Sequence, residues 1–201
     1  MAKVKILVEG SHEKVDGGFN LFCTTTLIKS DKNIIVDPGA FINEKKLLEA
    51  LKKEGLTPDD IDVVLLTHTH IDHTTNTHLF KNSKITMKFA GGEYAGQTHT
   101  LPKGFLERAD LIENPHIAKD VSVIFTPGHT LDMMSVVVKT DQGTVVITGD
   151  AIRVPELADL SNKEFPFITA DMEAYEESRK KILEIADYII PGHGPIIKIE
   201  K

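Results

Sequence analysis

The sequence is poor in cysteine and has no long hydrophobic run. Its single cysteine, Cys23, excludes an intrachain disulfide, and its strand-like surroundings favour a buried, inert thiol. No apolar run approaches the ~20 residues that a membrane-spanning helix needs, and the first residues lack the apolar core of a signal peptide. We therefore expect a cytoplasmic protein with no membrane partner.

Basic residues are in the minority. The chain of 201 residues carries 23 Lys and Arg against 30 Asp and Glu, a formal net charge of −7, which argues against a broadly basic nucleic-acid-binding surface. Hydrophobic residues make up 41% and charged residues 26%, the balance of a soluble globular protein. No repeat, low-complexity tract or linker-like change of composition interrupts the sequence. One domain over residues 1–201 is therefore predicted.

One stretch concentrates groups that bind metals. An apolar run at residues 63–66 leads directly to His68, His70, Asp72 and His73. Imidazole and carboxylate are the usual ligands of a borderline divalent metal such as zinc. A chance cluster on a solvated loop is the alternative, and four potential ligands directly after a buried strand weigh against it.

The remaining pattern mixes strands and helices. Amphipathic spacing predicts helices at residues 42–55 and 172–186, and a short helix at 74–81, directly after His73. Residues 10–19 are polar and contain three glycines, so we expect a loop there. The helix at 172–186 is expected to bury Met172, Tyr175, Ile182 and Leu183. Strands are predicted at residues 3–8, 21–28, 33–36, 61–66, 84–89, 121–125, 135–139, 144–148, 188–190 and 196–199.

Three further metal-type ligands follow apolar strands. His129, Asp150 and His193 each come directly after a glycine, which lets the backbone turn sharply so that the side chain can point at a common centre. Each could instead be a polar residue at a turn, but the recurrence predicts that they converge on the cluster at 68–73. Asp37 also follows a strand, and it is either a turn residue or a carboxylate that supports the site.

The ordered motifs His-x-His-x-Asp-His, Pro-Gly-His, Gly-Asp and Pro-Gly-His-Gly resemble those of the metallo-β-lactamase-fold hydrolase superfamily. The resemblance extends from residues 34–39 to Gly194. It implies an α+β fold, a four-layer αβ/βα sandwich in which two mixed β-sheets lie face to face and are flanked by helices. It also implies two metal positions that share Asp150 as a bridging ligand, one held by His68, His70 and His129 and the other by Asp72, His73 and His193.

Seven ligands shared between two divalent ions leave open positions, as in catalytic sites. A water that bridges the ions loses a proton near neutral pH and becomes a hydroxide nucleophile, and Asp72 is the candidate to orient it. Two divalent cations, two carboxylates and one hydroxide leave a net charge of about +1, which favours an oxyanion or phosphoryl transition state. Zinc suits these ligands, and manganese, iron, nickel and cobalt are the alternatives. Hydrolysis is the predicted reaction.

Departures from the family narrow this prediction. Asp150 stands where the commonest antibiotic-hydrolysing zinc enzymes carry a cysteine ligand, so β-lactamase activity is not expected. His70 stands where the flavin-associated di-iron relatives carry a glutamate. The residues around His129 and Asp150 are most similar to the small members grouped with metallo-β-lactamase domain-containing protein 1, whose implied activity is nuclease-like.

The expected reaction is cleavage of a thioester, lactone or phosphodiester in a small molecule. The alternatives are a metal-dependent nuclease acting on RNA or single-stranded DNA and a non-catalytic metal-binding member of the fold. A nuclease needs basic and aromatic side chains around its site. The loops expected at the mouth, residues 10–20, 90–105 and 151–168, mix both charge signs, and we expect their side chains, Arg153 included, to be solvated. The pattern predicts no oligomeric state.

Overall fold

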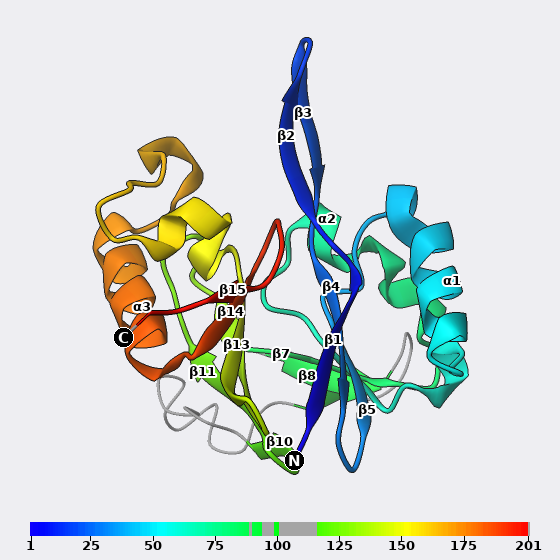
Figure 1. The fold of residues 1–201 in the computed structure, drawn as a ribbon. Helices are drawn as coiled ribbons and strands as arrows, with labels where there is room; N and C mark the ends of the chain where they lie inside the picture. Colours follow the sequence, from blue (N-terminus) through cyan, green and yellow to red (C-terminus); the bar gives the residue numbers. More distant parts are fainter. Residues whose placement is uncertain (89, 94–98, 101–115, 201) are drawn as a thin grey trace.

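The computed structural model describes residues 1–88, 90–93, 99–100 and 116–200. Two mixed β-sheets lie face to face, with helices α1 (Glu44–Lys53) and α3 (Met172–Ile185) on their outer sides (Figure 1). Apolar side chains from both sheets, among them Val36, Leu65, Val136 and Ile147, form one buried cluster between them. The predicted α+β sandwich is confirmed.

The first sheet has the strand order β1-β4-β5-β6-β7-β8-β9 in the described chain. Strands β5, β6 and β7 run parallel, so their carboxyl ends meet at one edge. Residues that follow β5 and β6 therefore emerge side by side. The strands are β1 (Lys3–Val8), β4 (Thr25–Lys29), β5 (Asn33–Val36), β6 (Val63–Leu65), β7 (Lys84–Met87), β8 (Ala90–Glu93) and β9 (His99–Thr100).

The second sheet has the order β10-β11-β12-β13-β14-β15. Strands β13 and β14 are parallel, and Gly149 pairs with Pro191. The residues that follow these two strands consequently leave the sheet at the same edge. The strands are β10 (His116–Ala118), β11 (Val121–Phe125), β12 (Met134–Thr140), β13 (Gly143–Gly149), β14 (Tyr188–Pro191) and β15 (Ile197–Lys198).

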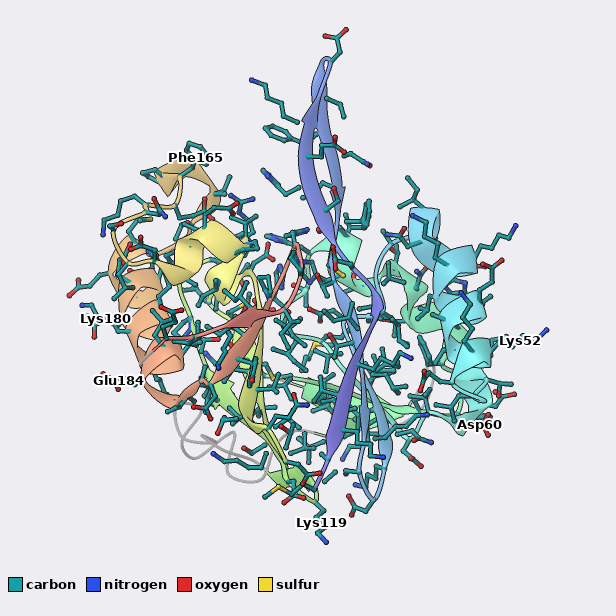
Figure 2. The ribbon with its side chains drawn as sticks, in the orientation of Figure 1. Lys52, Asp60, Lys119, Phe165, Lys180 and Glu184 are labelled. Carbon is teal, nitrogen blue, oxygen red and sulfur yellow. The ribbon has the colours of Figure 1, made fainter. Side chains whose placement is uncertain are left out.

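Two amphipathic helices cover the outer faces. Helix α1 (Glu44–Lys53) buries Leu47 and Leu51, and α3 (Met172–Ile185) buries Tyr175 and Ile182. Figure 2 shows Lys52 on the outer side of α1 and Lys180 and Glu184 on the outer side of α3. The shorter helices are η1 (Phe41–Asn43), η2 (Pro58–Asp60), α2 (Ile71–Thr74), η3 (Thr75–Leu79), η4 (Asp150–Ile152), η5 (Pro155–Ala158) and η6 (Pro166–Ile168).

The prediction of a loop at residues 10–19 is wrong. Strands β2 (Ser11–Val15) and β3 (Gly18–Phe22) form an antiparallel hairpin, which projects beyond the sandwich (Figure 1). Val15 pairs with Gly18, so the turn consists of Asp16 and Gly17, and Gly17 has a φ of +80° that glycine adopts without strain. Asp-Gly between strand residues is a strong hairpin signal, and it outweighs the polar composition.

Three smaller expectations also need correction. The helix placed after His73 begins at Ile71, so His73 lies inside α2. The strand expected over residues 21–28 is interrupted at Cys23 and Thr24, because the Thr24 N–H donates to Gly192 O of the second sheet at 2.7 Å. Met172 and Leu183 of α3 are only partly buried.

The thiol of Cys23 is fully buried, as expected. Burial raises its pKa to about 11, which keeps the sulfur protonated at neutral pH. Across the described parts of the chain, every helix is too short or too polar to traverse a lipid bilayer.

Candidate metal centre

The structure brings all seven predicted ligands together at the edge where the strand ends of the two sheets meet. The clustered atoms form two groups, and within each group they lie within 4.8 Å of one another. Ligation by these residues stays a prediction. The first group is His68, His70, His129 and Asp150, and the second is Asp72, His73 and His193.

Asp150 faces both groups. Its Oδ2 lies 3.4 Å from Nε2 of His129 and 4.0 Å from Nε2 of His68. Its Oδ1 lies 3.3 Å from Nε2 of His73 and 3.3 Å from Nε2 of His193. One carboxylate therefore presents a separate oxygen to each group, which is the arrangement of a bridging ligand.

The spacing within the first group fits one metal ion. Nδ1 of His70 lies 3.0 Å from Nε2 of both His68 and His129. Two ligands of a tetrahedral zinc ion, each at about 2.1 Å from it, are about 3.4 Å apart. Both separations from His70 are thus close to the one that a shared ion requires.

The second group has a similar spacing. Oδ2 of Asp72 lies 3.6 Å from Nε2 of His73 and 3.7 Å from Nε2 of His193. Nε2 of His73 and Oδ1 of Asp150 are buried, and neither has a hydrogen-bond partner among the described residues. Buried polar atoms are rarely left unpaired, and a cation between them would satisfy both. The residues therefore fit divalent metals.

Hydrogen bonds orient two of these imidazoles. Nδ1–H of His73 donates to Oδ2 of Asp37 at 2.8 Å, and Nδ1–H of His193 donates to the carbonyl oxygen of Phe22 at 2.9 Å. Each bond leaves Nε2 as the atom that faces the centre, because a neutral imidazole carries one donor and one acceptor.

The contacts of Asp37 decide between a turn residue and a carboxylate that supports the site. It is 2% exposed and accepts hydrogen bonds from the Thr67 N–H at 2.8 Å, the Thr67 hydroxyl at 2.7 Å and His73. Its φ of +50° lies in the left-handed region, which is strained for a residue other than glycine. These contacts make Asp37 a supporting carboxylate that positions His73.

Burial and neighbouring charges set the protonation states of the candidate ligands. Burial lowers the pKa of His68 to about 2 and also lowers the pKa of His129, so both imidazoles are neutral at pH 7. Burial would raise the pKa of Asp150, but His73 and His193 hold it well below its usual value. Burial would likewise lower the pKa of His73, but the carboxylates of Asp150 and Asp37 raise it well above 6.5. A metal at the second position would displace that proton.

Asp37→Asn is expected to weaken metal binding roughly 10- to 100-fold, because second-shell partners of metal-bound histidines contribute that much affinity. The amide cannot accept all three bonds with carboxylate strength, and His73 loses its fixed orientation. Competition against a chromophoric chelator measures the affinity. Asn76→Asp alters another buried polar side chain, which donates to the carbonyl oxygen of Pro38 and is not hydrogen-bonded to His73, and it is not expected to reproduce this loss of affinity. An unchanged affinity in Asp37→Asn would show that Asp37 has only a structural role.

A cavity of about 510 Å³ opens onto the centre. The predicted mouth segments 10–20 and 151–168 both contribute to it, whereas residues 94–98 and 101–105 lie outside the described residues. The expectation of a solvated Arg153 is wrong: its side chain is buried in an ion pair with Glu164. No local pattern links these two residues. The lining residues are His12, Leu21, His70, Asp72, His129, Asp150, Arg153, Ile168, Thr169, Ala170 and His193.

Comparison with known families and proteins adds to this geometry. The sequence model of the Metallo-beta-lactamase superfamily matches residues 18–193. Metallo-beta-lactamase domain-containing protein 1 from Xenopus laevis is 32% identical over 209 residues, which cover 98% of this chain and 82% of the relative. The chain spans only 59–63% of the length of the mammalian proteins of that name.

Two further proteins are similar over most of the chain. An N-acyl homoserine lactonase from Bacillus thuringiensis is 28% identical over 149 residues, covering 71% of this chain and 58% of the lactonase. A solved structure from Thermotoga maritima, described as a metallo-beta-lactamase, superposes with a TM-score of 0.70 at 24% identity. That superposition covers 98% of this chain and 99% of the other, and it supports the same fold.

Proposed function

The chain belongs to the metallo-β-lactamase superfamily, and from this premise we propose that it is a binuclear metal-dependent hydrolase that cleaves an ester-type bond in a small molecule. The observation that carries the proposal is the carboxylate of Asp150, whose two oxygens face two separate groups of ligands. Bound divalent ions would supply an acidified water and polarise the oxygen of the scissile group.

The roles of the residues follow from their positions. His68, His70 and His129 would hold one ion, His73 and His193 would hold the other with Asp72, and Asp150 would hold both. The Asp72 side chain is 18% exposed and lines the cavity. Its Oδ2 points at the second group, and no described residue donates to its Oδ1. In the proposed mechanism, Asp72 Oδ1 accepts a hydrogen bond from the attacking water and orients it.

A small molecule fits the cavity better than a polynucleotide. Its volume of about 510 Å³ lies in the range of small-ligand sites. Arg153 is the only lysine or arginine among the described lining residues, whereas nucleic-acid grooves need several basic and aromatic side chains. The similarity to an N-acyl homoserine lactonase supports a lactone as one member of the substrate class, beside thioesters and phosphodiesters.

Three further points belong to the proposal. Zinc is the proposed ion, because histidine nitrogens dominate the first group. The cytosol is the proposed compartment, because the only cysteine is a buried free thiol. Residues 1–201 are proposed to form one domain.

A substrate panel tests this function. Protein shown to carry two ions is incubated with a thioester, a lactone and a phosphodiester, and in parallel with labelled single-stranded RNA and DNA. We expect hydrolysis in the small-molecule panel that a chelator abolishes and added metal restores. Cleavage of RNA or DNA alone would replace the proposal by a nuclease. No cleavage by fully loaded protein would favour a non-catalytic metal-binding protein.

A further inference from the structure

Arg153 is a buried cation in the wall of the cavity, and the proposed hydrolysis gives it no role. Arg153 is 6% exposed and lines the cavity. Its carbonyl oxygen accepts a hydrogen bond from the His193 N–H at 2.7 Å. This bond ties the backbone of Arg153 to a residue of the second metal group, and both residues line the same cavity.

The guanidinium has a fixed orientation. Nε of Arg153 donates to Oε2 of Glu164 at 2.8 Å, and Nη2 donates to Oε1 at 2.9 Å. Glu164 is 4% exposed, and its Oε1 also accepts from the Phe165 N–H at 2.9 Å. A bidentate pair of this kind restricts both side chains to one geometry.

The segment that carries Glu164 is itself clamped to α3. The fully buried Arg179 donates from Nε to Leu157 O at 2.9 Å, from Nη2 to Asp159 O at 2.8 Å and from Nη1 to Asn162 O at 3.1 Å. Three carbonyls of one irregular stretch are thus bound by one side chain. Arg153 therefore projects from a rigid wall, as a residue that recognises a ligand must.

One edge of the guanidinium stays available. An arginine has five N–H donors, and Glu164 occupies only the edge formed by Nε and one hydrogen of Nη2. No described residue accepts a hydrogen bond from Nη1. A buried ion pair contributes little net stability by itself. Stability alone therefore does not account for an ion pair of Arg153 and Glu164 beside the cavity.

The rest of the cavity indicates what this edge would bind. Leu21, Ile168 and Ala170 supply an apolar lining, and the acidic lining residues, Asp72 and Asp150, belong to the metal groups. Arg153 carries one positive charge, which Glu164 partly balances. A single planar carboxylate matches the remaining pair of donors better than a dianionic phosphate monoester does.

We propose that Arg153 is a specificity-determining residue that binds a carboxylate of the substrate. The preferred substrate is then an ester-type compound with an apolar segment and a free carboxylate remote from the scissile bond. This inference rests on the proposed hydrolase function for its kinetic consequence, whereas the carboxylate site itself can be measured without hydrolysis.

Matched thioesters test the kinetic consequence. Succinyl and butyryl thioesters of N-acetylcysteamine have the same chain length and differ in the terminal carboxylate. We expect the wild-type protein to prefer the succinyl compound at least about tenfold in kcat/KM, since a charge-assisted pair contributes roughly this much. Arg153→Met should remove the preference by raising KM for the succinyl compound, and Arg153→Lys should keep only part of it.

Two further variants separate recognition from folding and net charge. Arg153→Met leaves Glu164 buried and unpaired, so Arg153→Met/Glu164→Gln removes the ion pair without leaving that charge. Lys163→Met makes the same change of net charge as Arg153→Met at a side chain that is 66% exposed and outside the cavity lining, and it should keep the preference. Metal content is measured for every variant. Equal losses on both thioesters would overturn the proposal.

Calorimetric titration with succinate and butyrate provides the readout that needs no catalysis. We expect metal-loaded wild-type protein to bind succinate about tenfold more tightly than butyrate, and the double variant to bind both equally. A wild-type protein without this preference would refute the carboxylate site. Failure of hydrolysis with the preference intact would instead refute the proposed enzymatic function.

Discussion

Asp150→Ala is expected to strip both metal ions from the protein. The substitution removes one oxygen from each group of ligands and leaves imidazoles with no shared carboxylate between them. We expect affinity at both positions to fall by more than about 100-fold, since even indirect partners of metal ligands contribute 10- to 100-fold. Metal analysis after equilibrium dialysis at fixed free zinc measures the stoichiometry.

Two other variants make this result interpretable. Asp150→Asn keeps the size of the side chain and loses its charge, so it separates ligation from the cavity that alanine leaves in a buried place. Asp141→Ala removes a carboxylate from the exposed turn that precedes the same strand, β13, and should keep both ions. Two tightly held ions per chain in both Asp150 variants would refute the bridging assignment.

Asp72→Asn is expected to lower turnover by about 100- to 10,000-fold, the usual contribution of a positioned acid–base group. The side chain lies near the start of α2 and is partly exposed, so the fold should persist. The amide retains an oxygen for the ion but loses the charge that orients the attacking water. Single-turnover rates, expressed per protein that carries two ions, separate this effect from loss of metal.

The matched control is Asp59→Asn, which neutralises an exposed carboxylate in η2, outside the cavity lining. It should leave both turnover and metal content unchanged. Turnover of Asp72→Asn equal to that of the wild type, with both ions bound, would remove Asp72 from the mechanism and leave it as a ligand only.

Local sequence predicted the features that depend on neighbouring residues. The capping pair of Thr57 and Asp60 is such a feature, because both partners lie within one turn of chain. Helices α1 and α3 follow their apolar spacing. The hairpin of β2 and β3 was also encoded locally, by Asp16 and Gly17, although its polar composition pointed to a loop.

The convergence of the predicted ligands was also within reach of the sequence. The ligand segments follow apolar strands, and the parallel pairs β5–β6 and β13–β14 place the residues that follow them at one edge. The sequence pattern did not predict how the two oxygens of Asp150 are shared between the groups. Oδ1 and Oδ2 face different groups, and this arrangement depends on the distance between the two sheets. The resemblance to the family supplied this role in advance, and the packed core between the sheets sets the geometry.

The sequence by itself determined the type of chemistry, because histidine and aspartate carry their affinity for metals wherever they are brought together. Only the tertiary structure decided which polar residues support that chemistry. Asp37 became a partner of His73 and Arg153 a partner of Glu164 through contacts between segments that lie 36 and 11 positions apart. Burial then excludes water from both pairs, so their bonds direct side chains instead of being solvated.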